Sequence, residues 1–90
     1  MFRIWMRKFK NTHLLEDTVI ENDNPEMSRT KKVYAALEEG CHRLNLSVPI
    51  WLDLNIRDFK RFASTRFTQD NFIGTIEFDY LDFRVIEEDH

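Results

Sequence analysis

Hydrophobic and polar residues alternate over the first part of the chain, and this period of two is typical of β-strands. Residues 2–9 carry apolar side chains at every second position, and they lack Gly and Pro. Residues 13–21 continue the alternation and include a β-branched run that favours extended backbone. Asn11, between them, tolerates a left-handed conformation. We therefore predict an N-terminal β-hairpin whose first strand faces the core through Phe2, Ile4 and Met6.

The pattern then changes to spacings of three and four, which are typical of one face of a helix. The stripe consists of Met27, Thr30, Val33, Tyr34, Leu37, Cys41 and Leu44. Asn24, followed by Pro25, is one candidate for the N-cap, and Ser28 is a competing cap one turn later. Asn45 suits the residue that follows a helix end. We predict one long helix that ends near Leu44 or Asn45.

A second, shorter helix is predicted after the apolar residues 50–52, with Asp53 or Asn55 as its cap. The pattern places Ile56, Phe59, Phe62 and Ala63 toward the core and the neighbouring cations toward solvent. Residues 64–66 are ambiguous, and residues 67–72 are expected to form a loop or a short turn.

The last predicted element is a long strand that begins at Gly74. Its alternation changes phase, because the apolar set moves from even positions in residues 76–80 to odd positions in residues 81–85. A slip of one residue turns every later side chain to the other face. A β-bulge near Tyr80 and Leu81 would absorb the slip, and so would a strand that is partly covered on both faces.

The order of these elements predicts a single α+β domain over residues 1–90. We expect a small antiparallel sheet of about three strands, the N-terminal hairpin plus the long C-terminal strand, covered on one face by one long and one shorter helix. The length fits one domain. The composition, 42% hydrophobic and 13% aromatic, argues against intrinsic disorder.

Composition excludes several classes of protein. The single Cys cannot form an internal disulfide, and two Gly leave no room for a glycine-rich phosphate loop. No apolar run approaches the roughly 20 residues that span a bilayer, and basic residues interrupt any signal sequence at the N-terminus. We therefore expect a cytoplasmic protein that does not contact membranes.

The formal net charge of −3 averages segments of opposite sign. Residues 1–10 carry four cations and no acid, whereas residues 11–28 carry five acids and no cation. Residues 71–90 carry six acids and one Arg. Opposite charges on neighbouring strands would explain this pattern, since cross-strand pairs stabilise a sheet. The alternative is a pair of oppositely charged surface patches that contact a partner.

Candidates for catalysis are few. Cys41 with a histidine is the one nucleophile pair to consider, but Cys41 lies on the apolar stripe, where a free Cys is usually a core residue. One Cys and the scattered His13, His42 and His90 do not have the spacing of a zinc site. The acidic pairs look like solvated surface. We expect no enzyme activity, no metal and no cofactor.

The segment 57–67 mixes basic and aromatic residues, a combination that can hold a phosphate backbone and stack bases. Its cations are Arg57, Lys60, Arg61 and Arg66. The alternative interpretation is an amphipathic helix with buried Phe59 and Phe62 and solvated cations. The net negative charge opposes nucleic-acid binding, because affinity depends mainly on neutralised phosphates.

Several short segments resemble a family of short uncharacterised cytosolic proteins from Gram-positive bacteria. The resemblance covers nearly the whole chain and rests on residues 4–5, 13–21, 49–52, 59–61, 65–67, 69–70, 72, 78–81 and 85–89. It implies a bacterial cytoplasmic setting and no particular activity.

These observations favour a small non-enzymatic interaction module that binds a protein partner or itself. Arg3, Trp5 and Arg7 share one face of the first strand, and Trp and Arg are common anchors of interfaces. Trp51 is a second candidate anchor. If the first strand lies at an edge of the sheet, it can also pair with another chain. The alternative function is nucleic-acid binding through the segment 57–67.

Overall fold

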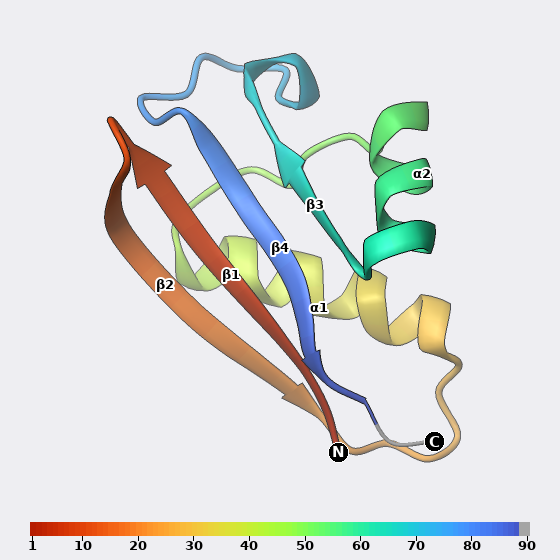
Figure 1. Cartoon of the computed structure of the whole chain (residues 1–90). Helices are drawn as coiled ribbons and strands as arrows, with labels where there is room; N and C mark the ends of the chain where they lie inside the picture. Colours follow the sequence, from red (N-terminus) through yellow and green to blue (C-terminus); the bar gives the residue numbers. More distant parts are fainter. Residues whose placement is uncertain (89–90) are drawn as a thin grey trace.

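The computed structural model describes residues 1–88 and shows an α+β fold, which confirms the predicted class. Four strands form one antiparallel sheet in the order β2-β1-β4-β3; the long helix α1 crosses one face of it, and α2 lies beside the edge strand β3 (Figure 1). The elements are β1 (Phe2–Lys10), β2 (His13–Asn22), α1 (Arg29–Arg43), α2 (Asp53–Phe62), β3 (Ser64–Phe67), the 3-10 helix η1 (Gln69–Asn71) and β4 (Tyr80–Glu87).

The N-terminal hairpin forms as predicted. Asn11 and Thr12 both have positive φ, at 50° and 66°, and two left-handed residues are what a tight two-residue hairpin turn requires. β1 is nevertheless a central strand, because β4 pairs with its other side. The condition under which β1 could pair with another chain, a position at the edge of the sheet, is therefore not met.

Helix α1 begins at the later of its two candidate caps. The side chain of Ser28 accepts a hydrogen bond from the backbone N–H of Lys31 at 3.2 Å. Asn24 instead accepts from the N–H of Glu26 in a turn that precedes the helix. Asn45, with φ of 57°, follows the helix end as expected.

Strand β3 is the element that the sequence pattern leaves unassigned. Ala63 adopts a left-handed φ of 54° and turns the chain directly from α2 into β3. Thr65 and Phe67 face the core, and Arg66 points to the other side. A four-residue strand that follows a helix without Gly or Pro offers little local signal, because its pairing with β4 decides its conformation.

Strand β4 begins at Tyr80, six residues later than the predicted start at Gly74. The change of phase needs no bulge at Tyr80 and Leu81, because the residues before them do not belong to the strand. The irregular segment before β4 instead packs Phe78 into one end of the core. The register shift between β1 and β4 lies at the opposite end, between Arg3 and Ile4.

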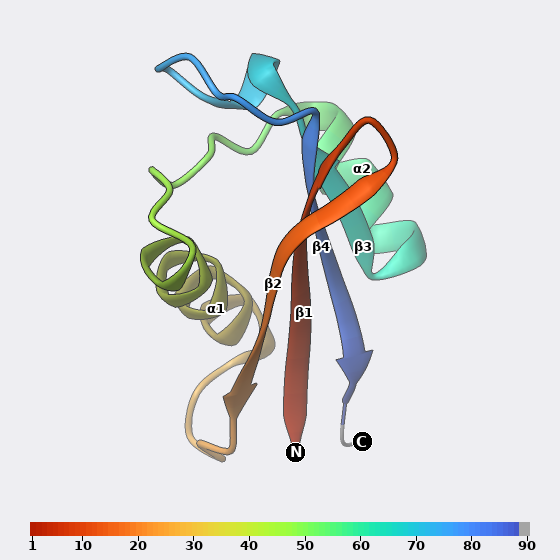
Figure 2. The same cartoon turned by 90° about the vertical axis from the view of Figure 1, so that its left-hand side faces the viewer.

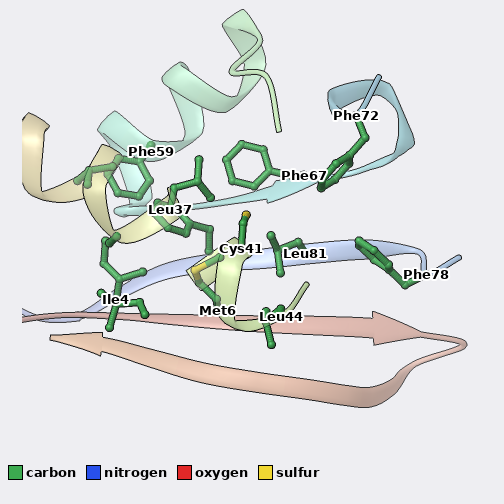
Figure 3. Close-up of a cluster of buried hydrophobic side chains, with 14 of the residues drawn as sticks. Ile4, Met6, Leu37, Cys41, Leu44, Phe59, Phe67, Phe72, Phe78 and Leu81 are labelled. Atoms are coloured by element: carbon green, nitrogen blue, oxygen red, sulfur yellow. The ribbon is translucent and has the colours of Figure 1, made fainter. Parts of the chain in front are cut away.

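The core lies between the sheet and the two helices (Figure 3). Ile4 and Met6 of β1 contribute from the sheet, and Leu37 and Cys41 contribute from α1. Gly40 lets α1 approach β1 closely, since a Cβ there would lie 1.9 Å from the sulfur of Met6.

An aromatic cluster fills the part of the core under α2. The ring of Trp51 makes edge-on contacts with Phe59, Phe67 and Phe83 at centroid distances of 5.1–6.0 Å. Trp51 is partly buried and packs against the core, where it also lines a pocket between α1 and α2, and its role as an interface anchor stays a prediction. The helical pattern predicts Phe62 and Ile56 in the core, but their side chains are 61% and 40% exposed.

Two buried amides, those of Asn55 and Asn71, lie on the core side of α2, where the apolar pattern predicts Phe62. Asn55 of α2 donates to Oγ1 of Thr65 and to the carbonyl of Arg66, both at 2.9 Å. Its Oδ1 accepts from the N–H of Leu52 at 3.1 Å and from Nδ2 of Asn71 at 2.7 Å. Asn55 and Asn71 therefore hold α2, β3 and η1 together.

Candidate functional site: the open face of the sheet

The two helices leave one face of the sheet uncovered, and β1 runs through its centre. Figure 2, in which β2 lies in front, shows α1 on one side of the sheet only. In β1 the buried residues alternate with half-buried ones, which point away from the helices. We call this surface the open face. It consists of Trp5, Arg7, Phe9, Asp17, Arg66, Tyr80, Asp82 and Arg84.

A row of charged residues crosses the open face from one edge of the sheet to the other. In strand order β2-β1-β4-β3, the row reads Asp17, Arg7, Asp82 and Arg66, and neighbours in the row are register partners. We call it the charge row. Its sign alternates at every step.

Arg7 and Asp82 form the centre of the charge row. Nη2 and Nε of Arg7 donate to Oδ2 of Asp82 at 2.8 and 3.3 Å. Asp82 is only 2% exposed, although it lies on the open face. Nε of Arg84 lies 3.5 Å from the same oxygen. The buried carboxylate is therefore neutralised by two arginines, and its pair with Arg7 is the tighter one.

Aromatic rings lie beside these arginines. The guanidinium of Arg7 lies 4.1 Å from the ring centroid of Trp5. Phe9 and Tyr80 stack across β1 and β4 with centroids 5.2 Å apart, and the guanidinium of Arg66 lies 4.4 Å from the ring of Tyr80. Trp5 is held in place by a 2.9 Å hydrogen bond from Nε1 to Oδ2 of Asp17. The result is a preformed surface of aromatic rings and guanidinium planes.

Cross-strand ion pairs explain most of the charge segregation in the sequence. The basic strand β1 lies between the acidic segments that form β2 and β4. Arg3 pairs with Glu87 at 3.1 Å and lies 3.8 Å from Glu21, and Lys8 pairs with Glu16 at 3.3 Å. Among the arginines of the open face, Arg7 and Arg84 pair with Asp82, whereas Arg66 is exposed and forms no ion pair within residues 1–88.

The open face continues past β3 into a shallow hollow of about 340 Å³ beside α2. Arg66 and Arg84 line it from the sheet, and Leu54 and Phe62 line it from α2. The two apolar side chains are 57% and 61% exposed. The hollow thus adds apolar area to the edge of the open face.

The structure divides the candidate binding residues into two groups. One group, which points to the uncovered side of the sheet, consists of Arg3, Trp5, Arg7 and Arg66. Arg3 forms its ion pair with Glu87, which lies outside the charge row. The cations Arg57, Lys60 and Arg61 are exposed on α2, beside the sheet, and none of the three lines the hollow next to Arg66. The segment 57–67 is therefore not one continuous basic surface.

Sequence reasoning missed several members of the open face, chiefly Phe9, Tyr80 and Arg84. Phe9 continues the odd-numbered face of β1, so alternation alone contained the signal for it. Tyr80 and Arg84 depend on where β4 begins and on its pairing with β1, which no local pattern reveals.

Cys41 is not placed as a nucleophile. Its side chain is fully buried in the core, whereas His13 and His42 are exposed, and His90 lies outside the described residues. Burial raises the pKa of the Cys41 thiol from 9.0 to about 11. Among residues 1–88, no group of three or more His, Cys, Asp and Glu side chains could hold a metal ion.

We expect native Cys41 to react with iodoacetamide at pH 8 about 100-fold more slowly than the same residue in the urea-unfolded chain, because a pKa raised by two units lowers the thiolate fraction by that factor. The raised pKa also means that this residue favours the folded state below pH 9 and loses that contribution between pH 9 and about 11. Equal alkylation rates in the two states would restore the nucleophile hypothesis.

No protein-family model, no curated protein and no solved structure matches this chain. In the part of the chain that the structure describes, neither helix is long and apolar enough to cross a membrane.

Proposed function

We propose that this protein is a small non-enzymatic interaction module that binds a protein through the open face of its sheet. The observation that carries the proposal is the set of Trp5, Phe9 and Tyr80 rings interleaved with Arg7 and Arg66 on an uncovered surface. Tyr, Trp and Arg are enriched among the residues that dominate protein interfaces. Mutual stacking holds these side chains in place before binding, which lowers the entropy cost of association.

A protein suits this face better than a nucleic acid does. Arg7 and Arg84 share the carboxylate of Asp82, and the neighbouring Arg3 lies between two glutamates. Cations that are already neutralised release few counterions from a phosphate backbone. None of the three cations of α2 lines the hollow beside Arg66, so they do not extend the open face as a continuous basic surface. Nucleic-acid binding therefore remains the alternative outcome of the test.

We also propose a cytoplasmic setting, in line with the resemblance to cytosolic bacterial proteins. The buried, unpaired Cys41 supports this, because a reducing compartment preserves free thiols.

The test compares three baits, the wild-type protein, Arg66→Glu and Arg57→Glu. Both variants reverse one exposed arginine, but only Arg66 lies on the open face. A partner captured from a lysate of the source organism is purified, and its affinity for each bait is measured by calorimetry. We expect Arg66→Glu to weaken binding by about tenfold or more, because repulsion between the new carboxylate and an acidic group of the partner costs more than about 1 kcal/mol. We expect Arg57→Glu to leave the affinity unchanged.

Two results would overturn the proposal. One is an affinity that falls in Arg57→Glu but not in Arg66→Glu. The other is salt-dependent binding of single-stranded RNA or DNA, measured by fluorescence polarisation and lost in a variant with Arg57, Lys60 and Arg61 replaced. That second result would establish the nucleic-acid alternative.

A further inference from the structure

The charge row has a symmetry property that bears on what the open face binds. It contains an even number of charges, begins with an acid on the outer strand β2 and ends with a base on the outer strand β3. When two copies of such a row face each other in opposite order, every acid lies opposite a base. When the row is turned around, Asp17 lies opposite Arg66, and Arg7 lies opposite Asp82.

We propose that the open face binds the open face of a second copy of this chain, about a two-fold axis that runs parallel to the strands between β1 and β4. The inference rests on the proposed function, because it names the partner of the same surface. A two-fold axis makes each contact occur twice, so one favourable pair becomes two. In this arrangement Asp17 of each copy faces Arg66 of the other, which gives that exposed guanidinium a carboxylate.

The rows next to the charge row fit the same symmetry. One level along the strands lie Val19, Trp5, Arg84 and Ser64, which are consecutive register partners. Reversal places the ring of Trp5 opposite the guanidinium of Arg84, a favourable cation–π combination. On the other side of the charge row, where Phe9 and Tyr80 are register partners, reversal places Phe9 opposite Tyr80 of the second copy. Sheets that pack face to face are about 10 Å apart, a gap that aromatic and arginine side chains span.

The two edges of the sheet are less suited to self-association than its face. At β3, the side-chain amide of Asn55 donates a hydrogen bond to the carbonyl of Arg66, and α2 packs against the strand. At β2, Arg43 donates to the carbonyl of Val19 at 3.0 Å. A second β2 strand would also bring the acidic side chains of Asp17 and Glu21 close to their own copies. Like charges on an edge oppose pairing with the same edge.

The size of the face sets the expected strength of the dimer. Three strands of about eight residues and the four-residue β3, about 4.8 Å apart at about 3.3 Å per residue, give roughly 440 Å² per copy. A standard interface buries about 800 Å² on each partner, so the area of the open face is smaller. The dimer should therefore dissociate on dilution, with the transition between about 10 μM and about 1 mM.

The test is a charge swap followed by sedimentation equilibrium over that concentration range. In a dimer of the Asp17→Lys variant, each new ammonium faces Arg66 of the other copy. In a dimer of the Arg66→Glu variant, each new carboxylate faces Asp17. We expect both variants alone to dimerise about tenfold or more weakly than the wild type, because like charges meet twice. An equimolar mixture of the two should recover the wild-type affinity, since both contacts of the heterodimer then join unlike charges.

Arg57→Glu is the matched control, and we expect it to dimerise like the wild type. Thermal melts of each variant show that it is folded. A wild-type chain that stays monomeric at about 1 mM overturns the dimer, while the capture experiment with Arg66→Glu still decides whether the open face binds another protein. A wild-type dimer that the mixture fails to restore overturns the two-fold arrangement.

Discussion

Arg7→Met is expected to lower the free energy of unfolding by about 3 kcal/mol, because removing one partner of a buried ion pair leaves the other charge uncompensated. Asp82 is only 2% exposed, and its closest cation is Nη2 of Arg7 at 2.8 Å. Methionine is unbranched and retains an aliphatic stem, so the change chiefly removes the charged guanidinium, which lies over Trp5. Arg84, at 3.5 Å, compensates in part, which places the loss near the lower end of the range for such pairs. Urea denaturation monitored by circular dichroism measures it.

Arg3→Met serves as the control for this change. Arg3 also lies on β1 and forms ion pairs with carboxylates of neighbouring strands, but its partners Glu21 and Glu87 are about half exposed. An exposed pair contributes about 0–1 kcal/mol. The double variant Arg7→Met with Asp82→Asn should recover part of the stability, because no charge then remains buried. Equal losses for Arg7→Met and Arg3→Met would contradict the assignment of a buried pair.

Asn55→Ala is expected to cost about 3 kcal/mol, because it leaves several buried groups without partners at once. The amide of Asn55 joins the carbonyl of Arg66, the hydroxyl of Thr65 and the amide of Asn71. A buried polar group that loses its partner costs about 1–3 kcal/mol, and nearby groups share the loss. Chemical denaturation measures the total, and proton–deuterium exchange should show β3 and the end of α2 opening first.

Two further substitutions locate the origin of this effect. Arg57→Ala, also on α2 but exposed, should change stability by no more than about 0.5 kcal/mol. Asn55→Asp keeps the oxygen that accepts from Leu52 and Asn71 but loses both donated hydrogen bonds. It should therefore destabilise the protein as well. A loss below about 1 kcal/mol in Asn55→Ala would show that these amides contribute little.

Elements with strong local signals could be predicted from the sequence. Asn11, which tolerates a left-handed turn, and the alternation in β1 predict the hairpin. The apolar stripe from Val33 to Leu44 predicts α1. Each of these depends on neighbours within a few positions. Burial on the correct face followed from the same periodicities, as Ile4 and Leu37 show.

Features that depend on distant contacts could not be predicted in this way. β3 exists because Ser64–Phe67 pairs with β4, and Asn55 is buried because Asn71 satisfies its amide. A hydrophobic pattern assigns such a place to an apolar residue, which explains why Phe62 was wrongly placed in the core. The pattern around Gly74 likewise looked like a strand, although those residues form an irregular segment.

The candidate site likewise combines features that a local pattern predicts with features that depend on the strand order. One strand was enough to place Arg3, Trp5 and Arg7 on a common face, because their alternation is local. The charge row needed the strand order, since Arg7 and Asp82 are 75 positions apart in the chain. Without that order, the cations of residues 57–67 looked like one group.

The order of strands in the sheet also constrains how the chain reaches its native state during synthesis. β4 lies between β1 and β3, so the strand that comes last of the four in the sequence joins the centre of the sheet. Until then, β3 has no partner strand, and the apolar side of the hairpin has only α1 to cover it. Pairings between such distant segments carry a large loop-closure cost and slow folding. The nascent chain therefore exposes apolar surface until β4 is available, a state in which chaperone binding would limit aggregation.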